Sequence, residues 1–249
     1  MDPAIARRLV ALNRDFYEGF AGEFSASRVR LHDGILEVFR RWDAAGRPVE
    51  SLVDLGCGDA RVGRAWIEGR LGPEWNEGRS RYLGVDFAPA LLHARGPVDR
   101  PGFALAACDV TADGGAALDG TGRFTHAVSF SVLHHVPGDA ARARFVRGLR
   151  DLLAPGGHWA VSVWQIAGKP RFADRILPWS TVGLDAGDLD PGDLLVDWRQ
   201  GGTGRRYVHE FERSEIRKLF ENNGLLVDSD FSSDGRSGDL GLYLIGRRA

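Results

Sequence analysis

The sequence is poor in cysteine and contains no long apolar run. Cys57 and Cys108 are the two cysteines among 249 residues, which is too few for a disulfide framework in a chain of this length. No apolar signal segment leads the sequence, so we expect a reducing, cytoplasmic setting. No apolar run approaches the ~20 residues that a membrane span needs, and we therefore expect no membrane partner.

An excess of charge of one sign is also lacking. The formal net charge is −2, whereas proteins that bind nucleic acid normally carry a basic excess or a basic stripe. The near-neutral net charge therefore gives no indication of a nucleic-acid partner. A local basic patch remains compatible with this net charge. The length suits one large domain with a sizeable core, and we expect a single domain over residues 1–249.

Short β-type runs alternate with helical segments along the middle of the chain, which is typical of an α/β fold with a parallel sheet. The runs are residues 51–55, 81–86, 103–108, 125–130 and 158–164. Near the end, Ser214 is expected to cap a helix that stops at Gly224. Residues 225–229 and 241–245 then predict a closing antiparallel pair.

Two other segments flank or interrupt this pattern. Apolar residues at helical spacing predict two helices within residues 1–48, which we expect to form an N-terminal helical cap. Residues 165–212 are rich in tryptophan, glycine and aspartate, show little periodicity, and are too long for a plain connection. This segment is either a solvated insertion or a lid over a site.

Two glycines directly follow the first β-type run. Gly56 and Gly58 lack side chains where a strand turns into a helix, so a ligand could approach the backbone there. A tight turn with no ligand is the alternative. Asp86 ends the second run, 28 positions after Gly58, where a carboxylate can accept both hydroxyls of a ribose.

The form of the glycine motif separates two kinds of adenosine ligand. Asp54 lies inside the first strand, and Arg61 stands where dinucleotide-binding motifs have a third glycine. A carboxylate would repel the pyrophosphate of a dinucleotide, so a dinucleotide oxidoreductase is disfavoured. S-adenosylmethionine instead brings an ammonium and a sulfonium, which tolerate a nearby acid.

Five motifs in order, VDLGCGDARVG, GVDFAPALL, ACDVT, FTHAVSFSVLHHVP and LLAPGGHWAVSVW, resemble those of class I S-adenosylmethionine-dependent methyltransferases. The resemblance implies a Rossmann-like seven-stranded sheet of order 3-2-1-4-5-7-6 with an antiparallel last strand, and S-adenosylmethionine as cofactor. It places Asp86 on the ribose, Asp109 on the adenine, and Asp54 with the glycines at the methionine. The cofactor-binding residues that it implies are Asp54, Gly56, Gly58, Asp86, Phe87, Asp109, Val110, Ser129 and Phe130.

Shorter flanking motifs, GEFSASR, VLHH, VWQ, LPW and RYVHEF, resemble methyltransferases that esterify the carboxymethyl group of the tRNA wobble uridine, and their bacterial look-alikes. This resemblance implies catalytic roles for Arg28 and for His134 or His135, and a possible small activating subunit. Arg28 suits a carboxylate, which is either that of the methionine moiety or that of the substrate. One histidine is expected to face the methyl donor and the other the protein.

The acceptor stays open between tRNA and a small molecule that offers an oxygen, a nitrogen or a carboxylate. A carboxylate needs no base, whereas a hydroxyl or amine needs a proton acceptor such as histidine. A third possibility is a partner protein that binds S-adenosylmethionine without turnover. We expect no metal, because the acidic residues between 185 and 197 miss the spacing of a calcium loop.

Overall fold

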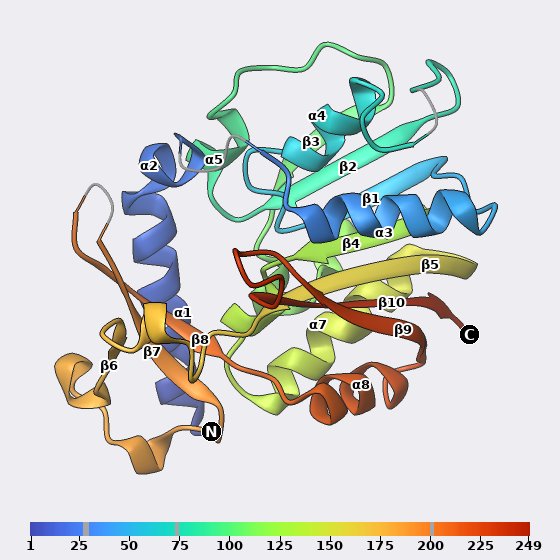
Figure 1. The fold of residues 1–249 in the computed structure, drawn as a ribbon. Coiled ribbons are helices and arrows are strands. Elements are labelled where there is room, and N and C mark those ends of the chain that lie inside the picture. The colour runs from blue at the N-terminus through green and yellow to red at the C-terminus, as the bar shows by residue number, and fades with distance from the viewer. Residues whose placement is uncertain (27–29, 73–74, 200–201) are drawn as a thin grey trace.

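A seven-stranded sheet with helices on both faces forms the body of the protein in the computed structural model (Figure 1). The structure describes residues 1–26, 30–72, 75–199 and 202–249. The strand order is β3-β2-β1-β4-β5-β10-β9, with β10 antiparallel to both of its neighbours, which confirms the expected sheet and its reversed strand. The strands are β1 Ser51–Leu55, β2 Arg81–Asp86, β3 Phe103–Ala107, β4 Phe124–Phe130, β5 Leu153–Trp164, β9 Leu225–Ser233 and β10 Gly241–Arg248.

One face of the sheet is covered by α3 (Asp33–Ala44) and α4 (Arg61–Ile67) (Figure 1). In α3, Val38, Phe39 and Trp42 recur at helical spacing and are buried in one apolar cluster with the sheet. The segment expected as an N-terminal cap thus includes a helix that belongs to the core of the sheet.

The opposite face is covered by α7 (Asp139–Leu152) and α8 (Arg213–Glu221). The expected cap at Ser214 is wrong. Glu212 precedes the helix, and its side chain and that of Glu215 form a reciprocal capping box. Phe145 and Phe220 are buried in a common core beneath these two helices.

The remaining elements lie beside the carboxyl ends of the parallel strands (Figure 1). The helix α1 (Pro3–Gly19) begins where the Asp2 side chain accepts a hydrogen bond from the N–H of Ala4 at 2.6 Å. It packs against a small antiparallel sheet of order β6-β7-β8, which lies within residues 165–212. The strands and the short helices are β6 Ile176–Leu177, β7 Asp193–Trp198, β8 Gly204–His209, α2 Ala21–Ala26, α5 Pro89–His93 and α6 Val110–Asp113.

None of the helices in the described ranges is both long and apolar enough to cross a lipid bilayer.

A close contact between helices gives the first testable prediction. A side chain on Gly148 of α7 would overlap the carbonyl oxygen of Gly114, which follows α6. We expect Gly148→Ala to lower the free energy of unfolding by about 2 kcal/mol or more, because backbone atoms must shift to admit a methyl group. Urea denaturation measures the loss. Gly187→Ala, where a methyl group meets no atom within 4 Å, is the matched control and should change little; equal stability of both variants would contradict the packing.

Candidate functional site

A pocket opens at the carboxyl ends of β1, β2 and β4, next to α1. Its empty volume is about 1160 Å³, open solvent at the mouth included, and is ample for a nucleoside-sized ligand. Nine of the residues predicted from the sequence line it: Asp54, Gly56, Gly58, Asp86, Phe87, Asp109, Val110, Phe130 and His135. Ser129 and His134 do not line it, and Arg28 lies outside the described residues.

The glycine turn forms the floor of this pocket. Gly56 has a φ of +77°, which favours glycine, and a side chain there would overlap Val132. The backbone N–H groups of Gly56 and Cys57 both donate to the carbonyl of Val85 in β2. The turn is therefore tied to the neighbouring strand, and its open backbone faces the pocket.

Asp86 is held rigidly at the end of β2. One carboxylate oxygen accepts the N–H of Gly58 at 2.9 Å, and the other accepts the N–H of Ala88 at 3.0 Å. Burial raises the pKa of Asp86 to about 6, although these two hydrogen bonds act in the opposite direction. Each oxygen keeps a lone pair that a ligand hydroxyl can use.

Asp54 is buried at the end of β1, and its exposed fraction is 2%. The Tyr82 hydroxyl donates to its carboxylate at 2.9 Å. Burial raises the pKa of Asp54 to about 7, and the negative charge of Asp86 adds to this rise. A cation next to Asp54 would therefore be strongly favoured.

Asp109 connects the end of β3 to α1. One carboxylate oxygen accepts the backbone N–H and the hydroxyl of Thr111, at 3.0 and 2.6 Å. The other accepts the Arg14 guanidinium at 2.6 Å, in a pair that is partly open to solvent. An adenine amino group at this place would share the oxygen that Arg14 contacts.

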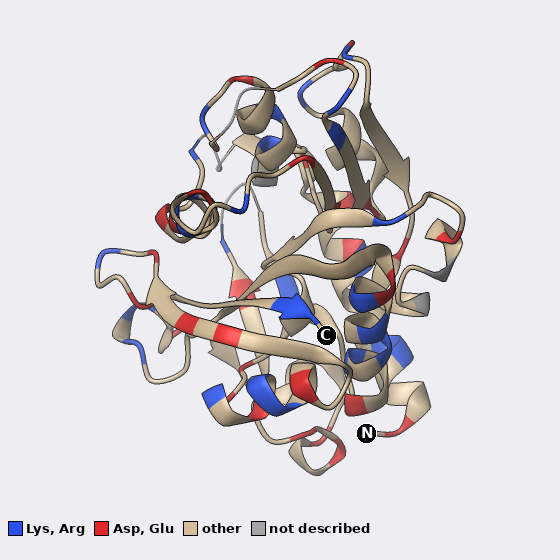
Figure 2. Cartoon of the chain, turned by 90° about the vertical axis from the view of Figure 1, so that its right-hand side faces the viewer, with Lys and Arg blue, Asp and Glu red and all other residues tan. Residues whose placement is uncertain are grey.

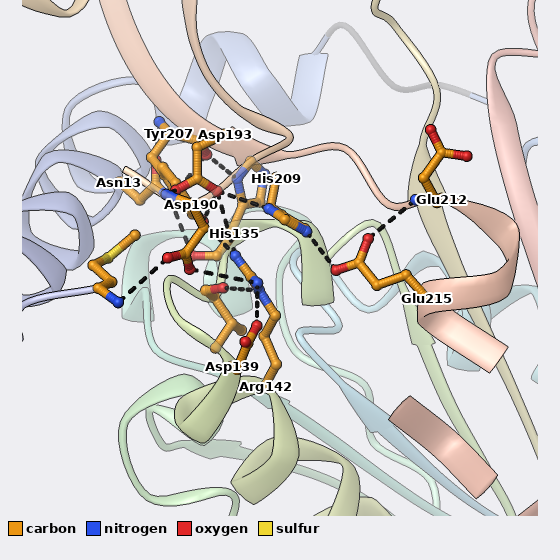
Figure 3. A network of polar contacts seen from close by, with 12 residues as sticks. Asn13, His135, Asp139, Arg142, Asp190, Asp193, Tyr207, His209, Glu212 and Glu215 are labelled. Carbon is orange, nitrogen blue, oxygen red and sulfur yellow. Dashed lines mark hydrogen bonds and ion pairs between the residues drawn. The ribbon is translucent and has the colours of Figure 1, made fainter. Parts of the chain in front are cut away.

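His135 lies between the pocket and the small sheet (Figure 3). Its Nδ1 is 2.8 Å from the carbonyl oxygen of Tyr207, which only accepts, so Nδ1 carries the proton of the neutral ring. Nε2 is then an acceptor, and it is 2.8 Å from the hydroxyl of Tyr17. Tyr17 and His135 therefore form a hydrogen-bonded pair in the pocket wall.

The side chain of Asn13 fixes the position of this pair. Asn13 accepts the N–H of Tyr207 at 2.8 Å and donates to the carbonyls of Tyr207 and His135, at 3.2 and 3.3 Å. One amide thus joins α1, β8 and the turn that carries His135.

A buried polar network supports β8 behind the histidine (Figure 3). The Tyr207 hydroxyl donates to Asp193 at 2.7 Å, and His209 lies between Asp193 and Glu215, at 2.7 and 2.9 Å. Burial lowers the pKa of His209, but its hydrogen bonds to the two carboxylates outweigh burial, and the pKa is raised. The network links β7, β8 and α8.

His134 points away from the pocket. Its side chain is fully buried, and its ring stacks on Trp164 with a centroid distance of 4.8 Å. The N–H of Trp164 donates to its Nδ1 at 3.4 Å. Of the two candidate histidines, His135 is the one that lines the pocket.

Ser129 also points away from the pocket, because its hydroxyl donates to the carbonyl of Leu55 at 2.9 Å. Ser131 lines the pocket instead. It has a φ of +62°, and its N–H donates to the carbonyl and the hydroxyl of Ser162. The chain leaves the strand at this residue, which no sequence pattern indicated.

Several other pocket residues come from outside the recognised motifs. They are Val10, Asn13, Arg14, Tyr17, His32, Ile35 and Tyr243. Four of them share one face of α1, and their helical spacing could have indicated this from the sequence: Val10, Asn13, Arg14 and Tyr17. Among the residues that the structure describes, no group of three or more histidine, cysteine or acidic side chains could hold a metal ion.

Comparison with known families and structures gives the class of protein. A family model described as a methyltransferase domain matches residues 53–159, and no curated protein matches the chain. A Micromonospora echinaspora amino pentose methyltransferase is similar at 20% identity, with a TM-score of 0.60 and coverage of 91% of this chain and 96% of that one. A Burkholderia thailandensis 1,6-didemethyltoxoflavin N1-methyltransferase is also similar at 20% identity, with a TM-score of 0.56 and coverage of 98% of this chain and 87% of that one.

A Haloferax volcanii methyltransferase in complex with the Trm112 activator is similar at 17% identity, with a TM-score of 0.60 and coverage of 94% and 96%. These likenesses establish the fold, and the matched model establishes a methyltransferase domain that contains the glycine turn and the three acidic residues of the pocket. The fold is that of class I S-adenosylmethionine-dependent methyltransferases, and the structure of the similar Micromonospora echinaspora enzyme contains bound S-adenosylmethionine.

The raised pKa of Asp54 gives the second prediction. A carboxyl group whose pKa is about 7 when folded and near 3.8 when unfolded stabilises the fold fully below pH ~4, and this contribution is lost as the pH rises through 7. Asp54→Asn removes the buried charge and keeps an acceptor for Tyr82. We therefore expect the unliganded variant to be more stable than the wild type at pH 8, by a free energy on the order of 2 kcal/mol, and this difference to be smaller at pH 5.

Scanning calorimetry at the two pH values measures this difference. The exposed Asp119 provides the control, since Asp119→Asn should show no such pH dependence. If Asp54→Asn is destabilised equally at both pH values, the fold needs the carboxylate itself and the argument is wrong.

Proposed function

We propose that S-adenosylmethionine lies across the pocket with its adenosine toward Asp86 and Asp109 and its methionine moiety toward Asp54 and the glycine turn. The arrangement of charges supports this orientation, because the most deeply buried carboxylate of the pocket would lie near the ammonium and sulfonium groups. Asp86 keeps a free lone pair on each oxygen for a ribose hydroxyl. Phe87, Val110 and Phe130 supply apolar walls.

The acceptor that we propose is a small molecule with a hydroxyl or amine group. The observation that carries this proposal is the Tyr17–His135 pair in the wall of the same pocket. Methyl transfer from a sulfonium is an in-line displacement, so the protein has to align the acceptor with the methyl group. The acceptor's proton would pass to Tyr17 while the proton of Tyr17 moves to Nε2 of His135. A bond between the acceptor oxygen or nitrogen and the methyl carbon would form as the methyl–sulfur bond breaks, and S-adenosylhomocysteine would leave.

In this proposal, the chain is one domain in which α1, from the segment 1–48, and the segment 165–212 close over the acceptor. Two contacts support a joint closure: Asn13 of α1 hydrogen-bonds to Tyr207 of β8, and Arg14 of α1 pairs with Asp109 at the end of β3. Both segments therefore touch the walls of the pocket. Closure around the reacting groups would exclude water from the transfer.

Esterification of a carboxylate, such as that of the carboxymethyl group of tRNA wobble uridine, is the second candidate function. It is favoured by the flanking sequence motifs and by the likeness to a methyltransferase bound to the Trm112 activator, and a small activating subunit belongs to this alternative. The formal net charge of −2 argues against it, because a protein that binds tRNA normally carries a basic excess. Figure 2 views the side of the molecule away from α1 and shows acidic and basic residues interspersed there.

The third prediction tests the cofactor site. S-adenosylhomocysteine should raise the melting temperature, because a ligand that binds only the folded state stabilises it, whereas NADH should not.

Asp86→Asn keeps a side chain of the same shape but loses an acceptor for the ribose, so we expect its affinity for S-adenosylhomocysteine to fall about tenfold or more. Titration calorimetry measures the change, with Asp119→Asn as control. Unchanged affinity of the Asp86 variant would move the ribose elsewhere.

The fourth prediction tests the acceptor. His135→Asn keeps a donor near the Tyr207 carbonyl but removes the acceptor at Nε2. With radiolabelled methyl donor and a small-metabolite extract, we expect labelling to slow by about 10²-fold or more, while the affinity for S-adenosylhomocysteine stays near that of the wild type. Total tRNA is assayed in parallel.

Three results would contradict the proposed acceptor. Label confined to tRNA would favour the second candidate, and so would base-labile products whose formation does not depend on His135, because a carboxylate needs no base. Tight cofactor binding without any labelled product would indicate a cofactor-binding partner protein instead.

A further inference from the structure

Arg206 is a buried cation that has no counter-charge among the residues that the structure describes. Its exposed fraction is 4%, and its guanidinium carbon lies 4.7 Å from the ring centre of Phe16, 4.7 Å from that of Trp164 and 5.0 Å from that of Trp198. Within the described ranges it takes part in no ion pair, and its Nε and Nη1 atoms have no hydrogen-bond partner. Aromatic rings stabilise such a cation only in part.

Arg142 provides a comparison in the same region of the protein. It is equally buried, yet it donates to the carbonyl of Val136, to Asp139 and to the Tyr207 hydroxyl, and it lies 3.4 Å from Asp193. Each of the three nitrogen atoms of the Arg142 guanidinium thus has a partner. Arg206 differs from it in having donors without acceptors, and unmet buried donors cost free energy.

Arg206 lies directly behind the wall of the pocket. Burial lowers the pKa of Arg206, and a hydrogen bond with the Tyr17 hydroxyl offsets this only in part. Tyr17 itself lines the pocket and contacts His135. The guanidinium is therefore one side chain away from the groups to which we assign proton transfer.

We propose that Arg206 recognises an oxyanion, such as a carboxylate, on the methyl acceptor. An anion there would meet the N–H groups of the two unsatisfied nitrogen atoms, Nε and Nη1, in a site from which aromatic rings exclude water, so the interaction would be strong. The inference rests on the proposed function and narrows its substrate class to anionic small molecules.

The position of Arg206 in the sequence favours the acceptor, and not the cofactor, as its ligand. Arg206 comes from β8, outside the matched methyltransferase domain of residues 53–159 that contains Asp54, Asp86 and Asp109. The carboxylate of the methionine moiety is the other anion near the pocket. If Arg206 held that carboxylate, its replacement would weaken cofactor binding, and the two assignments are therefore separable.

The experiment uses matched acids and amides on the protein saturated with S-adenosylhomocysteine. Benzoate and phenylacetate are the probes, and benzamide and phenylacetamide are their neutral counterparts. We expect the acids, and not the amides, to raise the melting temperature further. Equal stabilisation by acids and amides, or none by either, would overturn the proposal without any variant.

Variants then test the residue itself. Arg206→Met fills the aromatic box without a charge and is expected to fold with at least the stability of the wild type. It should bind S-adenosylhomocysteine normally and bind the acids about tenfold or more weakly. Arg205→Met is the control, because Arg205 is its exposed neighbour on β8 and should leave acid binding unchanged. Arg206→Lys serves if the methionine variant does not fold, and should also weaken acid binding.

Retained acid binding in the Arg206 variants would overturn the proposal, as would a loss of S-adenosylhomocysteine affinity, which would assign Arg206 to the cofactor. Failure of S-adenosylhomocysteine to stabilise the wild type would instead contradict the proposed orientation of the cofactor. A metabolite extract can be divided on an anion-exchange resin, and we expect the wild type to label the bound, anionic fraction and the Arg206 variants to label it less. Label confined to the unbound fraction would contradict the proposal. A base-labile product would identify the oxyanion as the methylated group itself.

Discussion

The hydrogen bonds that join the turn after β1 to the end of β2 are the constraint on which the site depends. Gly58 donates to Asp86, and Gly56 and Cys57 donate to Val85, so the glycine backbone and the carboxylate occupy fixed positions relative to each other. Parallel strands bring their carboxyl ends to one edge of the sheet, and this edge gathers Asp54, Asp86 and Asp109 around one pocket. Burial then sets the charge preference of that pocket, because two neighbouring carboxylates with raised pKa values favour a cationic ligand.

The site combines two parts of different origin in the sequence. The seven-stranded sheet supplies the glycine turn and the acidic residues, all within the matched methyltransferase domain. The wall with the Tyr17–His135 pair depends instead on α1 and β8, which Asn13 joins through hydrogen bonds to Tyr207. In the proposed function, the methyl donor thus binds to the shared fold, whereas the acceptor is recognised by the flanking segments.

Local patterns made the sheet and the acidic residues predictable. Each of the strands β1 to β4 is a short apolar run, and Asp54, Asp86 and Asp109 stand at or next to strand ends. The strand-end position indicated Asp86, and the motif resemblance indicated Asp54 and Asp109. Ser129, which the motifs suggested as a cofactor contact, does not line the pocket. The chain leaves β4 only after Phe130, so Ser131 lines the pocket instead. The roles of Asn13 and Arg206 were not predictable, since they arise from contacts between segments almost two hundred residues apart.

The contact between Asn13 and Tyr207 also has a consequence for biosynthesis. These residues are 194 positions apart, and α1 finds its packing partner in β8. During synthesis from the N-terminus, α1 leaves the ribosome long before that partner exists, at a usual rate of roughly 5–20 residues per second. Phe16 and Tyr17 are therefore exposed for about ten seconds or more while the chain is completed. The pocket wall that holds Tyr17 and His135 therefore assembles only after β8 has been synthesised.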